Sequence, residues 1–106
     1  KAKPLNHLPQ ISPASLKRVL QKYPDHAVID VRTDAEWNAG HIDCAKHIPI
    51  GQIIQKKVNL EKNAHITIVC ASGYRANIAG SILKAMGYDD VFTLIGGMTA
   101  WNNANG

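Results

Sequence analysis

Short apolar runs alternate along this chain with segments in which apolar residues recur at helical spacing. Three such runs, each flanked by polar residues or turns, are predicted to be strands: residues 27–31, 65–69 and 91–94. Ser12-Pro13 is typical of a helix cap followed by the first helical residue, and apolar residues continue at helical intervals as far as Tyr23. The N-terminal part of the chain is therefore predicted to form a helix before the first of these strands.

Further helices are predicted between and after the strands. Thr33 or Asp34 is expected to cap a short helix that Gly40 ends. Pro49 excludes a helix interior, so residues 47–50 are predicted to be an extended connection. The remaining predicted helices cover residues 51–57, 76–86 and 98–103, and the last follows a tight turn at Gly96-Gly97.

This alternation of strands and helices predicts a single α/β domain with a mostly parallel sheet. Residues 1–10 are predicted to be a linker and residues 11–106 the domain. The chain begins with Lys1 rather than Met, which indicates either a removed leader or a domain cut from a longer chain, and the second is favoured. In sheets of this kind, ligands bind beyond the carboxyl ends of the strands.

Composition narrows the class of partner. The formal net charge is +4, but the Lys and Arg residues are scattered, so no nucleic-acid partner is predicted. No apolar run approaches the roughly 20 residues that span a bilayer, so no membrane partner is predicted. The two cysteines, Cys44 and Cys70, have no CxxC spacing, which fits a reducing cytoplasm with at least one working thiol. A mild positive field suits a small anionic substrate.

The run Cys70-Ala71-Ser72-Gly73-Tyr74-Arg75 is the strongest chemical signal. It joins the predicted strand 65–69 to the predicted helix 76–86, so one sulfur lies at a helix N-terminus. Free backbone N–H groups and the helix dipole favour a thiolate there. Cys70 is therefore predicted to be a nucleophile acting on an anionic substrate. The competing interpretation is a buried structural cysteine beside a surface arginine.

The other residues of this loop are predicted to bind substrate. Backbone N–H groups from Ala71 to Ala76 can converge on whatever is bonded to the sulfur, and Gly73 allows the loop to close. Arg75 is suited to bidentate binding of an oxyanion. The loop contains no acid or base, whereas a phosphatase needs a general acid to protonate the departing oxygen. Transfer of a sulfane sulfur does not, because sulfite is a good leaving group.

The order of several short motifs resembles that of rhodanese domains of the single-domain sulfurtransferase type, over about residues 11–101. The landmarks are Ile29-Asp30-Val31-Arg32, Glu36-Trp37, Gly40-His41-Ile42, His47-Ile48-Pro49, the Cys70 loop, Met86-Gly87-Tyr88 and Gly96-Gly97 with Trp101. The resemblance implies three layers, with a mostly parallel sheet of about five strands flanked by helices on both faces. It also implies a cysteine that cycles between thiolate and persulfide.

The length of the loop distinguishes sulfurtransferases from phosphatases and arsenate reductases that share this fold. Four residues separate Cys70 from Arg75, as in sulfurtransferases, whereas the related phosphatases and arsenate reductases carry five. The amino-acid sequence of the loop is also similar to that of the corresponding loop in rhodanese domains fused to metallo-β-lactamase-type persulfide dioxygenases. The spacing favours sulfur over phosphorus as the element transferred.

Supporting roles are expected for four residues outside the loop. Asp30 and Arg32 point the same way at a strand end, so Arg32 either lies at the substrate mouth or forms a structural ion pair with Glu36 or Asp30. The ion pair, bracing the loop, is favoured. His41 could act as an acid or base, but hydrogen bonding that fixes its turn is favoured.

Other candidates are weaker. Cys44 is either a resolving thiol that attacks a Cys70 persulfide or, as favoured, a small residue that fills a turn. Trp37 and Trp101 are predicted to pack in the core or at its rim. The spacing of the remaining histidines is not typical of metal ligands; they are His7, His26, His47 and His65. No metal or cofactor is therefore predicted.

These features predict a sulfurtransferase that takes a sulfane sulfur from thiosulfate or a persulfide and passes it to cyanide or a thiol. The alternative is a persulfide carrier or sensor module with little turnover of its own, working with a fused or partner domain. A small phosphatase or arsenate reductase of the same fold is the least favoured alternative.

Overall fold

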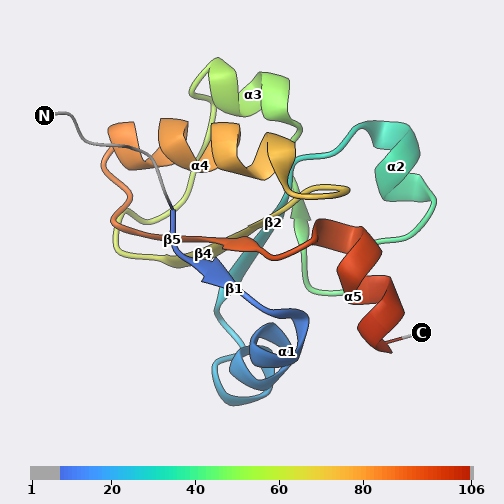
Figure 1. Ribbon diagram of the computed structural model, residues 1–106. Coiled ribbons are helices and arrows are strands. Elements are labelled where there is room, and N and C mark those ends of the chain that lie inside the picture. Colours follow the sequence, from blue (N-terminus) through green and yellow to red (C-terminus); the bar gives the residue numbers. More distant parts are fainter. Residues whose placement is uncertain (1–7, 106) are drawn as a thin grey trace, which may run out of the picture.

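Five parallel strands form the centre of the computed structural model, which describes residues 8–105 (Figure 1). They are β1 (Gln10–Ile11), β2 (Ala27–Asp30), β3 (Lys46–His47), β4 (His65–Val69) and β5 (Asp90–Leu94). Their order in the sheet is β1-β5-β4-β2-β3, and every pair is parallel. The central strand β4 therefore has its carboxyl end between those of β2 and β5.

Helices cover both faces of this sheet, as Figure 1 shows. They are α1 (Pro13–Lys22), α2 (Asp34–Asn38), α3 (Ile50–Ile54), α4 (Tyr74–Ala85) and α5 (Gly97–Asn105). Helices α3 and α4 lie on one face and α1 and α5 on the other, while α2 extends beyond the carboxyl end of β2. The predicted three-layer α/β fold is thus confirmed.

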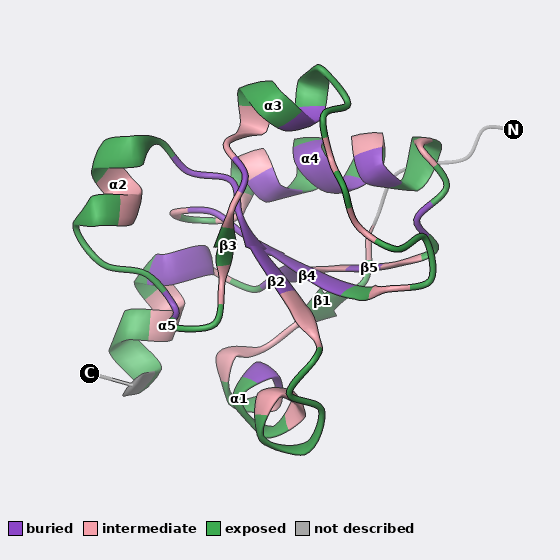
Figure 2. Cartoon of the chain, turned by 180° about the vertical axis from the view of Figure 1, so that it is seen from behind, coloured by how far each residue is buried: buried purple, intermediate pink, exposed green. Residues whose placement is uncertain are grey.

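Two hydrophobic clusters hold the layers together, because successive side chains of a strand point to opposite faces. Ile66 and Ile68 of β4 belong to the larger cluster under α3 and α4. Val69 belongs to the smaller cluster, where Leu16 of α1 and Met98 of α5 are buried. Figure 2 shows the central strands buried and the outer helical surfaces exposed. Among the described residues, no helix is long and apolar enough to cross a membrane.

Most predicted elements agree with the structure. Ser12 caps α1 by accepting a hydrogen bond from the Ser15 N–H at 3.1 Å. Thr33, one of the two predicted caps, begins α2 in a capping box with Glu36. The predicted strand at residues 65–69 has the bounds of β4.

Other bounds differ. Strands β1 and β3 were not predicted, since two residues carry no alternating pattern. Helix α4 begins at Tyr74 rather than residue 76, and α5 begins at Gly97 and is longer than predicted. Of the predicted linker 1–10, Gln10 belongs to β1 and residues 1–7 lie outside the described part of the chain.

Candidate active site

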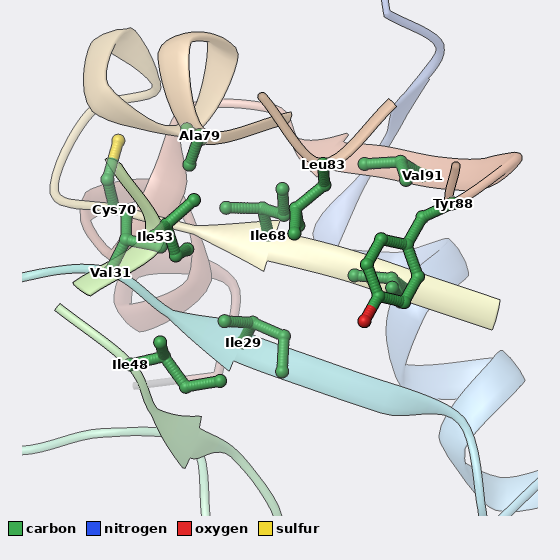
Figure 3. Close-up of a cluster of buried hydrophobic side chains, with 12 residues drawn as sticks. Ile29, Val31, Ile48, Ile53, Ile68, Cys70, Ala79, Leu83, Tyr88 and Val91 are labelled. Carbon is green, nitrogen blue, oxygen red and sulfur yellow. The ribbon is translucent and has the colours of Figure 1, made fainter. Parts of the chain in front are cut away.

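Cys70 is the first residue after β4 and is 1% exposed. Figure 3 shows it at one end of the cluster under α3 and α4, beside Val31 and Ile53, with Tyr88 at the far end. The thiol therefore lies at the carboxyl edge of the sheet and is shielded from bulk water. This is the edge at which α/β proteins bind ligands.

The loop after Cys70 is closed by Gly73. Its N–H donates a hydrogen bond to Cys70 Sγ at 2.8 Å. Gly73 has a φ of 117° and is the N-cap of α4, a conformation that a residue with a side chain rarely adopts. The sulfur thus accepts a hydrogen bond at the N-terminus of a 12-residue helix, where the helix dipole favours negative charge.

Helix α5 binds the other side of this loop. The N–H groups of Met98 and Thr99 donate to the carbonyl oxygens of Cys70 and Ala71, at 2.8 and 3.1 Å. The Thr99 hydroxyl adds a third hydrogen bond, also to Ala71 at 3.1 Å. Both carbonyl oxygens therefore accept hydrogen bonds from α5. Sequence reasoning did not find this role of α5, although Gly96-Gly97 was a visible signal.

Close packing at the start of α5 requires a glycine. A Cβ placed on Gly97 would collide with the carbonyl oxygen of Cys70 and with the backbone of Ala71. Gly97 also has a φ of 58°, in the left-handed region. The position of the reactive loop therefore depends on the absence of a side chain at Gly97.

Arg75, in the first turn of α4, forms a bidentate ion pair with Glu36 of α2. Its Nη1 and Nη2 atoms donate to Oε1 and Oε2 of Glu36, each at 2.8 Å. Hydrogen bonding to Arg75, together with the Thr33 N–H, lowers the pKa of Glu36 to about 2. The same bonds raise the pKa of Arg75, with smaller contributions from the charges of Cys70 and Asp30. The guanidinium predicted to hold the substrate anion is already neutralised by a carboxylate.

Comparison with known proteins identifies this arrangement. The model of the rhodanese-like domain matches residues 12–104. The chain belongs to the rhodanese family.

Individual relatives agree with this assignment. The rhodanese chain is 33% identical over 94 residues to thiosulfate sulfurtransferase GlpE of Pseudoalteromonas translucida, covering 89% of each protein. It is 31% identical over 94 residues to the "Putative sulfur carrier protein YrkF" of Bacillus subtilis. This match covers 89% of the present chain but only 51% of the relative. A crystal structure of a rhodanese-like domain protein from Staphylococcus aureus superimposes with a TM-score of 0.81 at 36% identity, covering 89% of this chain and 91% of that one.

The remaining loop residues of this rhodanese domain differ in exposure. In the first turn of α4, Ala76 is fully buried, whereas Tyr74 is 75% exposed. Ser72 is exposed and Ala71 is half-buried.

Asp30 and Arg32 form a separate, buried ion pair. Arg32 Nε and Nη2 donate to the Asp30 carboxylate at 2.8–3.1 Å, and Nη2 also donates to the Gly40 carbonyl at 2.7 Å. Of the two partners considered for Arg32, the structure therefore selects Asp30. The pair fixes the chain after α2, and Glu36 is left for Arg75.

His41 packs on α2. One of its ring nitrogens, Nδ1, hydrogen-bonds with the Trp37 carbonyl at 2.9 Å, and its ring stacks on Trp37 with centroids 3.5 Å apart. His47 also stacks on Trp37, at 4.7 Å. These contacts fix the turn after α2, the role favoured for His41 from sequence.

Cys44 is exposed as a residue, but partial desolvation of its thiol raises the pKa of that group. It precedes the start of β3, whereas Cys70 follows the end of β4, and both cysteines are free. Cys44 lies in the turn at Asp43-Cys44, two residues before Lys46 pairs with Ile29 of β2. This position agrees with the favoured interpretation of Cys44 as a turn residue.

A cavity of about 500 Å³ lies at the opposite, amino edge of the sheet. It is lined by Val19, Tyr23, Asp25, His26, His65 and Asp90. Among residues 8–105, no group of three or more His, Cys, Asp or Glu side chains could hold a metal ion. This cavity is formed around the starts of β2, β4 and β5, away from the sulfur.

We predict that Gly97→Ala destabilises the protein by about 3 kcal/mol, because the new Cβ meets backbone at a positive φ. Gly80→Ala is the matched control. Its Cβ meets the tip of the flexible Leu8 side chain, and alanine favours the helix, so we expect a change within about 1 kcal/mol. Urea unfolding measures both, and equal effects of the two substitutions would contradict the role given to Gly97.

We also predict that the Glu36–Arg75 ion pair makes the free energy of unfolding decrease at acidic pH. The folded-state pKa of Glu36 is about 2, below the ordinary 4.5, so its contribution is present above about pH 4.5 and is lost as the pH falls toward 2. The stability advantage of wild type over Glu36→Gln should therefore be larger at about pH 7 than at about pH 3 in urea unfolding. An advantage that does not change with pH would refute this.

Proposed function

We propose that this protein is a sulfurtransferase that carries a sulfane sulfur on Cys70 as a persulfide. The observation that carries the proposal is the buried Cys70 thiol at the end of β4, with the Gly73 N–H directed at Sγ at 2.8 Å. Membership of the rhodanese family and a relative named thiosulfate sulfurtransferase support sulfur transfer as the general activity.

The first half of the reaction loads Cys70. Its thiolate attacks the outer sulfur of thiosulfate or of a persulfide, the donor S–S bond breaks, and sulfite or a thiolate leaves with the electron pair. A new S–S bond then joins Cys70 to the transferred sulfur. Neither leaving group needs a proton from the protein, so the absence of an acid in the loop is no obstacle.

The second half unloads the enzyme. A thiol or cyanide attacks the outer sulfur of the persulfide and restores the Cys70 thiolate. N–H groups at the start of α4, which have no partner within the helix, are suited to stabilising negative charge on the outer sulfur. A persulfide carrier with little turnover is the second candidate, supported by a half-matched relative named as a sulfur carrier.

Phosphate or arsenate chemistry is less well supported. Besides the short spacing from Cys70 to Arg75, the carboxyl group that contacts Arg75 is a poor proton donor. Glu36 has a pKa of about 2 and is ionised at neutral pH, so it would not protonate a leaving oxygen.

We predict that Cys70→Ser reduces thiosulfate:cyanide sulfur transfer to the uncatalysed background, because a serine hydroxyl cannot form a persulfide. Cys44→Ser is the matched control, since it removes the exposed cysteine, and it should retain activity. Intact-mass spectrometry after polysulfide treatment should show the mass of one added sulfur atom on wild type and not on Cys70→Ser.

The outcomes separate the candidates. Loading of Cys70 without steady-state transfer would support the carrier. Equal activity of wild type and Cys70→Ser, or Cys70-dependent hydrolysis of an aryl phosphate without sulfur loading, would overturn the proposal.

A further inference from the structure

The charge around Cys70 is balanced, although the chain as a whole carries +4. Arg75 is neutralised by Glu36 through two hydrogen bonds of 2.8 Å, with the two side chains 29% and 33% exposed. Arg32 is neutralised by Asp30 at 2.8 Å, with side chains 8% and 1% exposed. Both guanidinium groups near the reactive loop therefore already have a carboxylate partner.

Within the described residues that border the ends of β2 to β5, no further Lys or Arg is found. Residues 30–38, 48–53, 70–78 and 95–101 follow or end the strands β2 to β5, and their only other charged side chain is Asp34. Asp34 is 87% exposed and so is strongly screened by solvent. A sulfur donor bound at the site meets the Gly73 N–H and a helix N-terminus. It meets no unpaired positive charge from these segments.

This charge balance discriminates between the two donors. Thiosulfate brings two negative charges to a Cys70 thiolate, so three negative charges must be accommodated before and after the transfer: Cys70–S⁻ + S–SO₃²⁻ gives Cys70–S–S⁻ + SO₃²⁻. An organic persulfide reacts as R–S–S–H: Cys70–S⁻ + R–S–S–H gives Cys70–S–S–H + R–S⁻. Here one S–S bond breaks and one forms, the proton stays on the transferred sulfur, and the reacting sulfur atoms carry only one negative charge throughout.

We propose that the preferred donor is an organic persulfide rather than thiosulfate, and that Glu36 determines this preference by neutralising Arg75. The inference rests on the proposed sulfur transfer through Cys70. Glu36 is a specificity-determining residue that acts through Arg75, whereas the hydrogen bond to Cys70 Sγ comes from Gly73.

A purely structural role for this ion pair would have a different signature. Glu36→Gln and Arg75→Gln break the same ion pair, so a mere brace would be weakened in both and would affect both donors alike. The local charge changes in opposite directions, however, by +1 in Glu36→Gln and by −1 in Arg75→Gln. Glutamine at position 36 can still accept the Thr33 N–H in the capping box, so the start of α2 is retained.

The test compares glutathione persulfide and thiosulfate as donors to the whole protein, by kcat/KM and by single-turnover mass spectrometry of Cys70. Wild type should favour the persulfide by about tenfold or more. Glu36→Gln should raise kcat/KM for thiosulfate about fivefold relative to the persulfide, mainly through a lower KM, and Arg75→Gln should shift the ratio the other way. Asp34→Asn, which removes an exposed carboxylate from the same helix, should leave the ratio unchanged.

Several results would overturn the inference: a wild-type preference for thiosulfate, a donor ratio that neither variant moves, or a shift in the same direction in both. Thermal unfolding of each variant identifies any that do not fold, and either of the two charge variants is enough to test the direction of the shift. If Cys70 in wild type accepts sulfur from neither donor, the proposed sulfur transfer itself fails, which is a separate outcome.

Discussion

The backbone between β4 and α4 is held between the N-termini of two helices, and the rest of the site depends on this. Helix α5 donates N–H groups to the carbonyl oxygens of Cys70 and Ala71, while the N–H of Gly73 at the start of α4 faces the sulfur. The first N–H groups of a helix have no partner within it, so both helix ends can supply donors without losing internal bonds. The two carbonyl oxygens therefore accept hydrogen bonds from α5, and the sulfur accepts one from Gly73.

Helix α2 connects this backbone arrangement to the charge of the site. The carboxylate of Glu36 accepts the Thr33 N–H in the capping box and also binds Arg75 at the start of α4. One side chain thus stabilises the beginning of α2 and removes the free charge of the loop arginine. The local fold after β2 and the electrostatics around Cys70 cannot be varied independently, because the capping box and the ion pair with Arg75 share Oε1 of Glu36.

Local signals in the sequence predicted much of this fold. Ser12-Pro13 and Thr33 identify helix starts because capping depends on the side chain at one position, and the apolar run at residues 65–69 has the bounds of β4. Strands β1 and β3 could not be found in this way. Each has two residues and is defined by its partners β5 and β2 rather than by any pattern of its own.

At the site, the position of the candidate nucleophile, the length of its loop and the helix that follows it could all be predicted from the sequence. These are properties of neighbouring residues, and Cys70, Gly73 and Arg75 carry them. The partners of these residues come from distant parts of the chain: Glu36 lies 39 positions from Arg75, and Thr99 lies 28 positions from Ala71. Such contacts depend on the order of strands in the sheet and on how α2 and α5 pack at its edge, and no local pattern of side chains specifies either.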